Sequence, residues 1–204
     1  MFHVEQTGPE PGFAKYEQIL GTRGIELGLI GPRERDRLAD RHILNCAVVA
    51  RSQKLVPAGS DVIDVGSGAG LPGLVWAIER PDLKVVLVDS LLRRSEFLTD
   101  TIAELALTDR VSVIRARAED LVDLSADVVT ARAVAPLPRL VGWLRPLMRP
   151  SGQLVLLKGA KASQEITAAA PLASELGLRP AELITLDVEG LATPTTVVRY
   201  QAEK

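Results

Sequence analysis

Apolar residues in the N-terminal quarter of the chain recur at helical spacing. Between residues 13 and 54 they stand three or four positions apart, which places them on one face of a helix. Gly31-Pro32 interrupts this pattern, and a proline suits the first turn of a new helix. The sequence therefore predicts a helical N-terminal extension, residues 1–56, packed on a core domain formed by residues 57–204.

From Asp61 onward the pattern changes to short apolar runs separated by longer amphipathic stretches. Nearly continuous apolar runs are typical of strands that are buried on both faces of a parallel sheet. The runs lie at 62–65, 85–88, 111–114, 128–129 and 154–157, and the helical stretches between and after them at 71–79, 92–105, 136–147 and 161–176. This alternation predicts a doubly wound α/β sheet.

The C-terminal end breaks the alternation. Residues 181–188 and 195–201 both have strand character, and only residues 189–194 separate them. A connection this short joins antiparallel strands, because a parallel crossover needs a dozen or more residues. We therefore expect five parallel strands followed by an antiparallel hairpin, which together make a seven-stranded Rossmann-like sheet.

Composition indicates the number of domains, the type of core and the cellular compartment. The 204 residues suit one domain with a small appendage, and 47% hydrophobic with 3% aromatic residues predicts an aliphatic core. The single cysteine, Cys46, excludes a disulfide framework and favours a reducing compartment, so we expect a cytoplasmic protein. Residues 1–12 contain acids and prolines and read as a tail rather than a signal peptide. We expect no membrane association and no metal site.

Charge is uneven along the chain. The formal net charge is −2, which does not by itself indicate a nucleic-acid partner. Residues 33–54, however, carry six Lys/Arg against three Asp/Glu, with His42 in addition. This stretch is either a solvated helix face or a basic face for RNA phosphates, and the sequence leaves both interpretations open.

A glycine-rich loop, Gly66 to Gly73, follows the first predicted strand. Its segment Gly68-Ala69-Gly70-Leu71-Pro72-Gly73 matches the dinucleotide fingerprint G-x-G-x-x-G. Glycines let the backbone turn tightly and approach a ligand, and the following helix offers free N–H groups. The loop could hold the pyrophosphate of a dinucleotide, the methionine carboxylate and ribose of S-adenosylmethionine, or no ligand at all.

Two acids and the chain's ending help to choose between these cofactors. Asp64, two residues before Gly66, favours S-adenosylmethionine, because an acid there can hold the methionine amino group. Asp89, which ends the second strand, would accept hydrogen bonds from ribose hydroxyls. Both cofactors have such hydroxyls, so Asp89 does not discriminate between them. The C-terminal hairpin and the chain length favour a class I S-adenosylmethionine-dependent methyltransferase. A Rossmann-type NAD(P)-dependent oxidoreductase is the alternative, although it normally needs a further substrate domain.

Loops after the later strands supply further candidates. Glu119 would read the adenine edge or complement a helix dipole. Arg132, after the fourth strand, would face the acceptor. Lys158 ends the fifth strand and points to the carboxyl edge, where ligands bind in open α/β folds, although a plain surface lysine is the alternative.

The absence of several motifs reduces the number of possible methyl acceptors. Residues 130–136 lack the Asn/Asp-Pro-Pro-aromatic motif that is common where exocyclic amines are methylated. Cys46 suits a small core residue better than the nucleophile needed at pyrimidine C5, and no feature signals a base for a protein lysine acceptor. An atom that is already nucleophilic, such as guanine N7, remains. It needs alignment rather than a general base, with an arginine or lysine near O6 or the phosphates.

Several motifs, in this order, resemble the RsmG family, also called glucose-inhibited division protein B. They are Arg41 to Cys46, Gly66 to Gly73 with Pro72, Leu92 to Leu98, Arg117-Ala118-Glu119, Ala131-Arg132-Ala133 and Leu157-Lys158-Gly159. The resemblance extends from about Tyr16 to Tyr200, and residues 28–34 look similar to actinobacterial members.

The resemblance implies methylation of N7 of a guanine in 16S ribosomal RNA. The partner would be naked RNA, an assembly intermediate or the small ribosomal subunit, and the enzyme a monomer. Together with the residues above, it gives expected S-adenosylmethionine contacts at Asp64, Gly66, Gly68, Gly70, Leu71, Asp89, Ala118, Glu119 and Arg132. Expected catalytic residues are Arg132 and Lys158, and expected RNA contacts are His42, Arg93 and Arg94.

Overall fold

The computed structural model describes residues 11–187, 191 and 193–203. Most of the expected N-terminal tail and the middle of the expected C-terminal turn lie outside the described residues. Within them, no helix is both long and apolar enough to cross a membrane.

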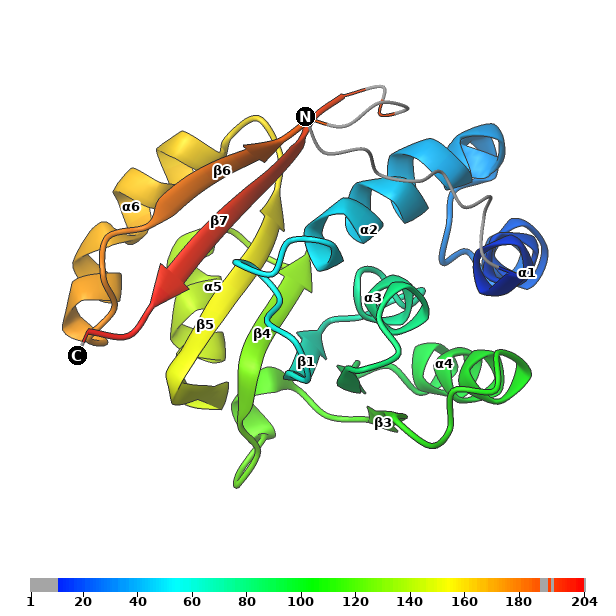
Figure 1. The fold of residues 1–204 in the computed structure, drawn as a ribbon, viewed down its shortest axis with the longest axis horizontal. Helices are drawn as coiled ribbons and strands as arrows, with labels where there is room; N and C mark the ends of the chain where they lie inside the picture. Colours follow the sequence, from blue (N-terminus) through cyan, green and yellow to red (C-terminus); the bar gives the residue numbers. More distant parts are fainter. Residues whose placement is uncertain (1–10, 188–190, 192, 204) are drawn as a thin grey trace.

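The described residues form a seven-stranded sheet in the order β3-β2-β1-β4-β5-β7-β6 (Figure 1). Strands β1 to β5 pair in parallel, whereas β7 runs antiparallel to both β5 and β6. This arrangement confirms the predicted parallel sheet with a C-terminal hairpin. The strands are β1 Asp61–Val65, β2 Lys84–Val88, β3 Val111–Ile114, β4 Ala126–Arg132, β5 Met148–Lys158, β6 Glu182–Leu186 and β7 Thr195–Gln201.

Helices cover both faces of this sheet. Figure 1 shows α2, α3 and α4 together on one side and α5 and α6 on the other, and two separate apolar clusters fill the two interfaces. The helices after β1 are α3 Gly73–Glu79, α4 Leu92–Glu104, α5 Leu137–Leu144 and α6 Ala162–Glu175. Because each strand ends at the same edge of the parallel sheet, the loops that enter these helices meet there.

The N-terminal segment is helical, as predicted, but not uniformly α-helical. Between α1, Pro11–Ile19, and α2, Asn45–Ala50, the chain forms a π-helical turn at Leu20–Gly24, a 3₁₀ segment at Pro32–Arg37 and a π-helical segment at Leu38–Leu44. Such segments are set by tertiary contacts rather than by side-chain periodicity, and π-helical turns are frequent at functional sites.

This segment packs on the sheet through α3. Tyr16 and Leu38 are buried in the same apolar cluster as Trp76 of α3. The Trp76 indole N–H also donates a hydrogen bond of 3.0 Å to the backbone oxygen of Cys46. Cys46 itself is fully buried, as expected for a core residue. The N-terminal segment therefore shares one continuous core with the sheet.

Candidate active site

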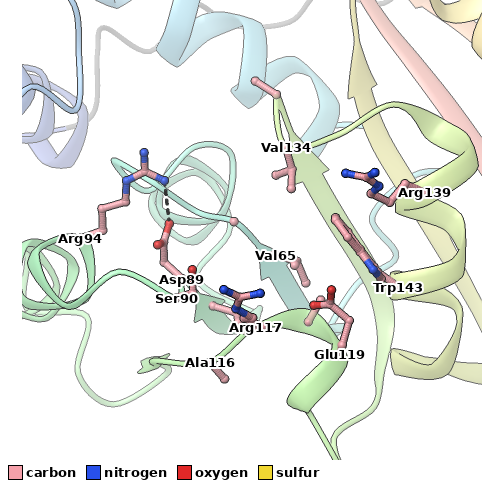
Figure 2. A pocket seen from close by; sticks show the side chains of 14 residues that line it. Val65, Asp89, Ser90, Arg94, Ala116, Arg117, Glu119, Val134, Arg139 and Trp143 are labelled. Atoms are coloured by element: carbon pink, nitrogen blue, oxygen red, sulfur yellow. Dashed lines mark hydrogen bonds and ion pairs between the residues drawn. The ribbon is translucent and has the colours of Figure 1, made fainter.

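A cavity of about 460 Å³ lies at the carboxyl edge of the sheet, over the ends of β1 and β2. We call it the glycine-loop cavity. Figure 2 shows Asp89 and Arg94 on one side of it, Arg139 and Trp143 on the other, and Arg117 and Glu119 between them. Its lining residues are Val65, Gly66, Val88, Asp89, Ser90, Arg94, Ala116, Arg117, Ala118, Glu119, Ala133, Val134, Arg139 and Trp143.

The glycine loop needs its glycines for two different reasons. Gly66 has φ +72°, a left-handed conformation, and a Cβ there would lie 2.5 Å from Cγ2 of Val134. A Cβ on Gly73 would lie 2.8 Å from the Asp64 carboxylate, so Gly73 lets the start of α3 pack directly on β1. The first glycine shapes the cavity wall and the second fixes the helix behind it.

Asp64 lies fully buried beneath this loop rather than on the cavity wall. Its Oδ2 accepts a hydrogen bond of 3.0 Å from the Gly73 N–H, while Oδ1 has no partner among the described residues. Burial raises the pKa of Asp64 to about 7, against the hydrogen bonds that lower it. Asp64 therefore anchors the loop and keeps one oxygen available.

Asp89, at the end of β2, does line the cavity and is held in place by backbone donors. Its Oδ2 accepts from the Gly68 N–H at 3.0 Å and its Oδ1 from the Leu91 N–H at 3.0 Å. The Arg94 guanidinium adds a longer contact of 3.4 Å. A carboxylate fixed in this way presents its remaining lone pairs to hydroxyl donors in the cavity.

The opposite wall was not predicted from the sequence. Arg139 and Trp143, both on α5, line the cavity, and the guanidinium lies 5.7 Å from the indole centroid. Residues four positions apart share a helix face. A close reading of 137–144 as one amphipathic helix beside the sheet edge could therefore have found this pair.

A second cavity, of about 680 Å³, lies on the other side of the loop after β4. We call it the cationic cavity, because Arg41, Arg132, Lys158 and Lys161 line it. Ala133 lines both cavities and has φ +57°, an uncommon conformation for a residue with a Cβ. The remaining lining residues are Asn45, Leu157, Gly159, Ala160, Glu165, Thr193, Pro194 and Thr196.

Arg132 ends β4 and is held from the N-terminal segment. Its Nη2 lies 2.9 Å from Nδ1 of His42. Its Nη1 donates to Sγ of Cys46 at 3.1 Å and to the backbone oxygen of His42 at 3.4 Å. Arg132 lines the cationic cavity but not the glycine-loop cavity.

Lys158 ends β5 and braces the loop after β4. Its ammonium group donates to the backbone oxygen of Ala135 at 3.1 Å and pairs with Glu165 at 2.7 Å. Glu165 also accepts from the Leu137 N–H at 2.8 Å. Burial alone would raise the pKa of Glu165, but these bonds together hold it below its usual value, so the carboxylate stays charged.

The predicted residues thus divide into groups. Gly66, Asp89, Ala118 and Glu119 meet in the glycine-loop cavity, together with Arg94. The other loop residues predicted to touch a cofactor lie outside that lining: Asp64, Gly68, Gly70 and Leu71.

The remaining candidates are separated from that cavity. Arg132 and Lys158 meet in the cationic cavity. Arg93 is exposed on α4. The His42 side chain is only 14% exposed.

Comparison with known proteins supports a methyltransferase. A model of the GidB family, described as rRNA small subunit methyltransferase G, matches residues 10–188. A Nocardioides protein named ribosomal RNA small subunit methyltransferase G is 50% identical over 186 residues, which covers 91% of this chain and 73% of that protein. A relative of the same name from Kineococcus radiotolerans is 51% identical over 188 residues, with 91% and 72% covered.

Solved structures agree at the level of the fold. The S-adenosylmethionine-dependent methyltransferase SibL is similar with a TM-score of 0.65 at 17% identity, covering 96% of this chain and 70% of that one. The fold is therefore that of class I methyltransferases, and nothing in these comparisons supports the oxidoreductase alternative. Both of these relatives are actinobacterial, which agrees with the similarity seen at residues 28–34. With the family match extending over most of its length, the chain belongs to the GidB family of rRNA small subunit methyltransferases.

Proposed function

We propose that this protein transfers a methyl group from S-adenosylmethionine to N7 of a guanine in the 16S RNA of the small ribosomal subunit. The observation that carries the proposal is the family match over residues 10–188. The geometry supports it, because a cofactor-sized cavity and a cationic cavity meet at one residue, Ala133. Methyl transfer needs two adjoining sites of this kind, because the methyl donor and the acceptor atom must lie next to each other.

The glycine-loop cavity fits S-adenosylmethionine. Asp89 would accept the ribose hydroxyls, and Ala118 and Glu119 would meet the adenine edge. The buried Oδ1 of Asp64, which has no hydrogen-bond partner in the described part of the chain and lies next to the loop, suits the methionine amino group directly or through water. Gly68, Gly70 and Leu71 would act by shaping the loop. When bound, this cofactor supplies a methyl group on a positively charged sulfur.

The cationic cavity fits the acceptor nucleotide. Arg132 would donate to guanine O6 or to a phosphate, and Arg41 and Lys161 would add positive charge around the RNA backbone. Lys158 would act through the loop, since it holds the Ala135 oxygen and thereby fixes Ala133 and Val134 between the two cavities. Arg93, which is exposed on α4 outside both cavity linings, would contact RNA away from the acceptor base.

No general base is needed for this acceptor. The N7 lone pair would form a bond to the methyl carbon as the carbon–sulfur bond breaks. The sulfur would leave as a neutral thioether, the ring would take over the positive charge, and no proton would leave the ring. Glu165, the carboxylate among the described lining residues of the cationic cavity, is occupied by Lys158 and by the Leu137 N–H. The nearby His42 has both ring nitrogens in hydrogen bonds. The cationic cavity would therefore act by aligning the acceptor, and alignment alone can supply much of the rate.

Two measurements test the proposal. Calorimetric titration should show binding of S-adenosylmethionine and not of NAD(H), and the opposite result would return the oxidoreductase alternative. Nucleoside analysis of 16S RNA from a strain lacking the gene should show the loss of one 7-methylguanosine. An unchanged 7-methylguanosine content in that strain would contradict the proposed acceptor.

A further inference from the structure

We propose that Glu34 and His42 are positioning residues that hold the Arg132 guanidinium at the wall of the cationic cavity. The inference rests on the proposed function, since it assigns Arg132 to the acceptor side. It makes the N-terminal segment part of the reaction machinery rather than only a cover for the sheet. The link joins the 3₁₀ segment Pro32–Arg37, the π-helical segment Leu38–Leu44 and the end of β4.

The hydrogen bonds fix the state of the His42 ring. Arginine nitrogens only donate, so the His42 Nδ1 that lies 2.9 Å from Arg132 must accept and carries no proton. The ring proton of neutral His42 is therefore on Nε2, which lies 3.0 Å from Oε2 of Glu34. A carboxylate only accepts, so this second bond agrees with the first. Glu34 orients the ring, and the ring orients the guanidinium.

Burial and charge keep His42 in this state at neutral pH. Its side chain is 14% exposed, and burial lowers its pKa, with the Arg132 and Arg41 charges adding to that effect against Glu34, which raises it. The charged groups around the ring are Glu34 from the 3₁₀ segment, Arg41 from its own segment and Arg132 from β4. A protonated His42 would turn Nδ1 into a donor that faces a cation, and Arg132 would be released.

The consequence for the site is local. Arg132 immediately precedes Ala133, the residue that lines both cavities, so its anchoring to His42 holds the end of β4 directly beside the wall between them. A displacement of about 1 Å at a reacting centre can cost about 100-fold in rate. Holding Arg132 from the N-terminal segment therefore matters more for turnover than for stability.

Histidine variants give the first test, with small subunits from the deletion strain as substrate and the whole protein as enzyme. His42→Ala should lower kcat by about 10- to 100-fold while KM for S-adenosylmethionine changes little. His42→Asn should recover much of kcat, because its side-chain oxygen lies near the position of Nδ1 and can accept from Arg132. Wild-type kcat in His42→Ala would overturn the proposal. So would a loss confined to KM for the subunits in both variants, because it would make His42 a direct RNA contact.

The pH profile separates positioning from packing. Wild-type kcat should fall at acid pH, below the usual titration range of histidine, as His42 gains a proton, whereas His42→Asn should lack this decline. The same acid decline in both proteins would overturn the proposal. This comparison decides the matter even if His42→Ala fails to fold.

Two further measurements do not rely on the histidine variants. The chain has two histidines, so the ¹⁵N signals of the His42 ring can be assigned by comparison with His42→Asn. They should show an Nε2-protonated neutral ring, and an Nδ1-protonated ring would contradict the hydrogen-bond assignment.

Glu34→Ala should lower kcat. Asp36 is an exposed acid two positions away, and Asp36→Ala should leave kcat unchanged. Equal effects of the two would overturn the role of Glu34. Absence of methyl transfer by the wild type would instead contradict the proposed function.

Discussion

The two cavities at the sheet edge share Ala133 but are built from different parts of the chain. The glycine-loop cavity is lined mostly by the loops that follow β1, β2 and β3, so its residues come from consecutive strand–loop units. The cationic cavity brings together residues from 41 to 196, including the N-terminal segment, the ends of β4 and β5 and the start of β7. One is local in sequence and the other is assembled by the tertiary fold.

Their charges differ in the same way. The glycine-loop cavity mixes the acids Asp89 and Glu119 with arginines, as a ligand with hydroxyl, amino and carboxylate groups requires. The cationic cavity has four cations against one acid among its described lining residues, and that acid is paired with Lys158. We infer that the first cavity recognises a small zwitterionic molecule and the second an anionic polymer. Substitutions should therefore affect either cofactor affinity or turnover, but seldom both.

The largest effect is expected at Arg132. Arg132→Ala should lower turnover on small subunits by about 100-fold, because it removes the donor that we propose aligns the acceptor. The Kd for S-adenosylmethionine should stay near the wild-type value, since Arg132 does not line the glycine-loop cavity. Filter assays of methyl transfer and calorimetry measure the two quantities. A Kd that rises in parallel with the loss of turnover would place Arg132 on the cofactor side and break the comparison.

The next largest effect is expected at Gly66, where the Kd for S-adenosylmethionine should change rather than turnover. Gly66→Ala should raise the Kd for S-adenosylmethionine by at least about tenfold, because φ +72° disfavours a side chain and the new Cβ would push Val134. Gly59→Ala is a matched control, since Gly59 has φ +68° but no neighbour within 4 Å of the added Cβ. Both variants should lose roughly 1–2 kcal/mol of stability. Equal Kd values for the two would show that the Gly66–Val134 contact does not shape the cofactor site.

Asp64 gives a pH-dependent prediction on the cofactor side. Its pKa in the folded protein is about 7, above the unfolded value, so the folded state binds the extra proton between about pH 4 and pH 7. Stability from this group is present at low pH and is lost as the pH rises through that range, by up to about 1.4 kcal/mol per pH unit. Urea unfolding of wild type and Asp64→Asn should therefore diverge steadily over this range. A constant difference between the two proteins would mean that Asp64 is ionised throughout.

The smallest effect is expected at Tyr16. Its hydroxyl donates a hydrogen bond of 2.7 Å to the backbone oxygen of Ala69, within the glycine loop. Tyr16→Phe should cost about 1 kcal/mol of stability and raise the Kd for S-adenosylmethionine only a few-fold, with turnover at saturation unchanged. Thermal unfolding and calorimetry measure these changes. A fall in saturated turnover would show that the N-terminal segment acts on the cofactor loop as well as on Arg132.

The sequence predicted the sheet better than the N-terminal segment. Apolar runs such as 62–65 and 85–88 coincide with β1 and β2 to within one residue, because a strand that is buried in the sheet is apolar along most of its length. The π-helical and 3₁₀ segments between residues 20 and 44 could not be read from spacing, since apolar positions three and four apart suit all three helix types. Their geometry depends on partners that are distant in sequence, such as Arg132, which contacts His42 from 90 positions away.

The site divides in the same way. Gly66, Asp89 and Glu119 could be predicted because each follows a strand, and parallel strands bring such positions to one edge. Arg132 turns toward His42, which is 90 positions away in the sequence. This orientation depends on tertiary packing that no local motif encodes. Arg139 and Trp143 were missed because only their spacing of four positions on the predicted helix 136–147 marks them, and no glycine or acid stands with them.

The most direct test of the central claim is methyl transfer by the purified protein. Small subunits from a strain lacking the gene would be incubated with methyl-labelled S-adenosylmethionine, and their 16S RNA digested to nucleosides for mass spectrometry. The account predicts label in 7-methylguanosine alone, close to one per subunit with wild type and sharply reduced with Arg132→Ala. Label in another nucleoside, or no label although the protein binds S-adenosylmethionine, would contradict it.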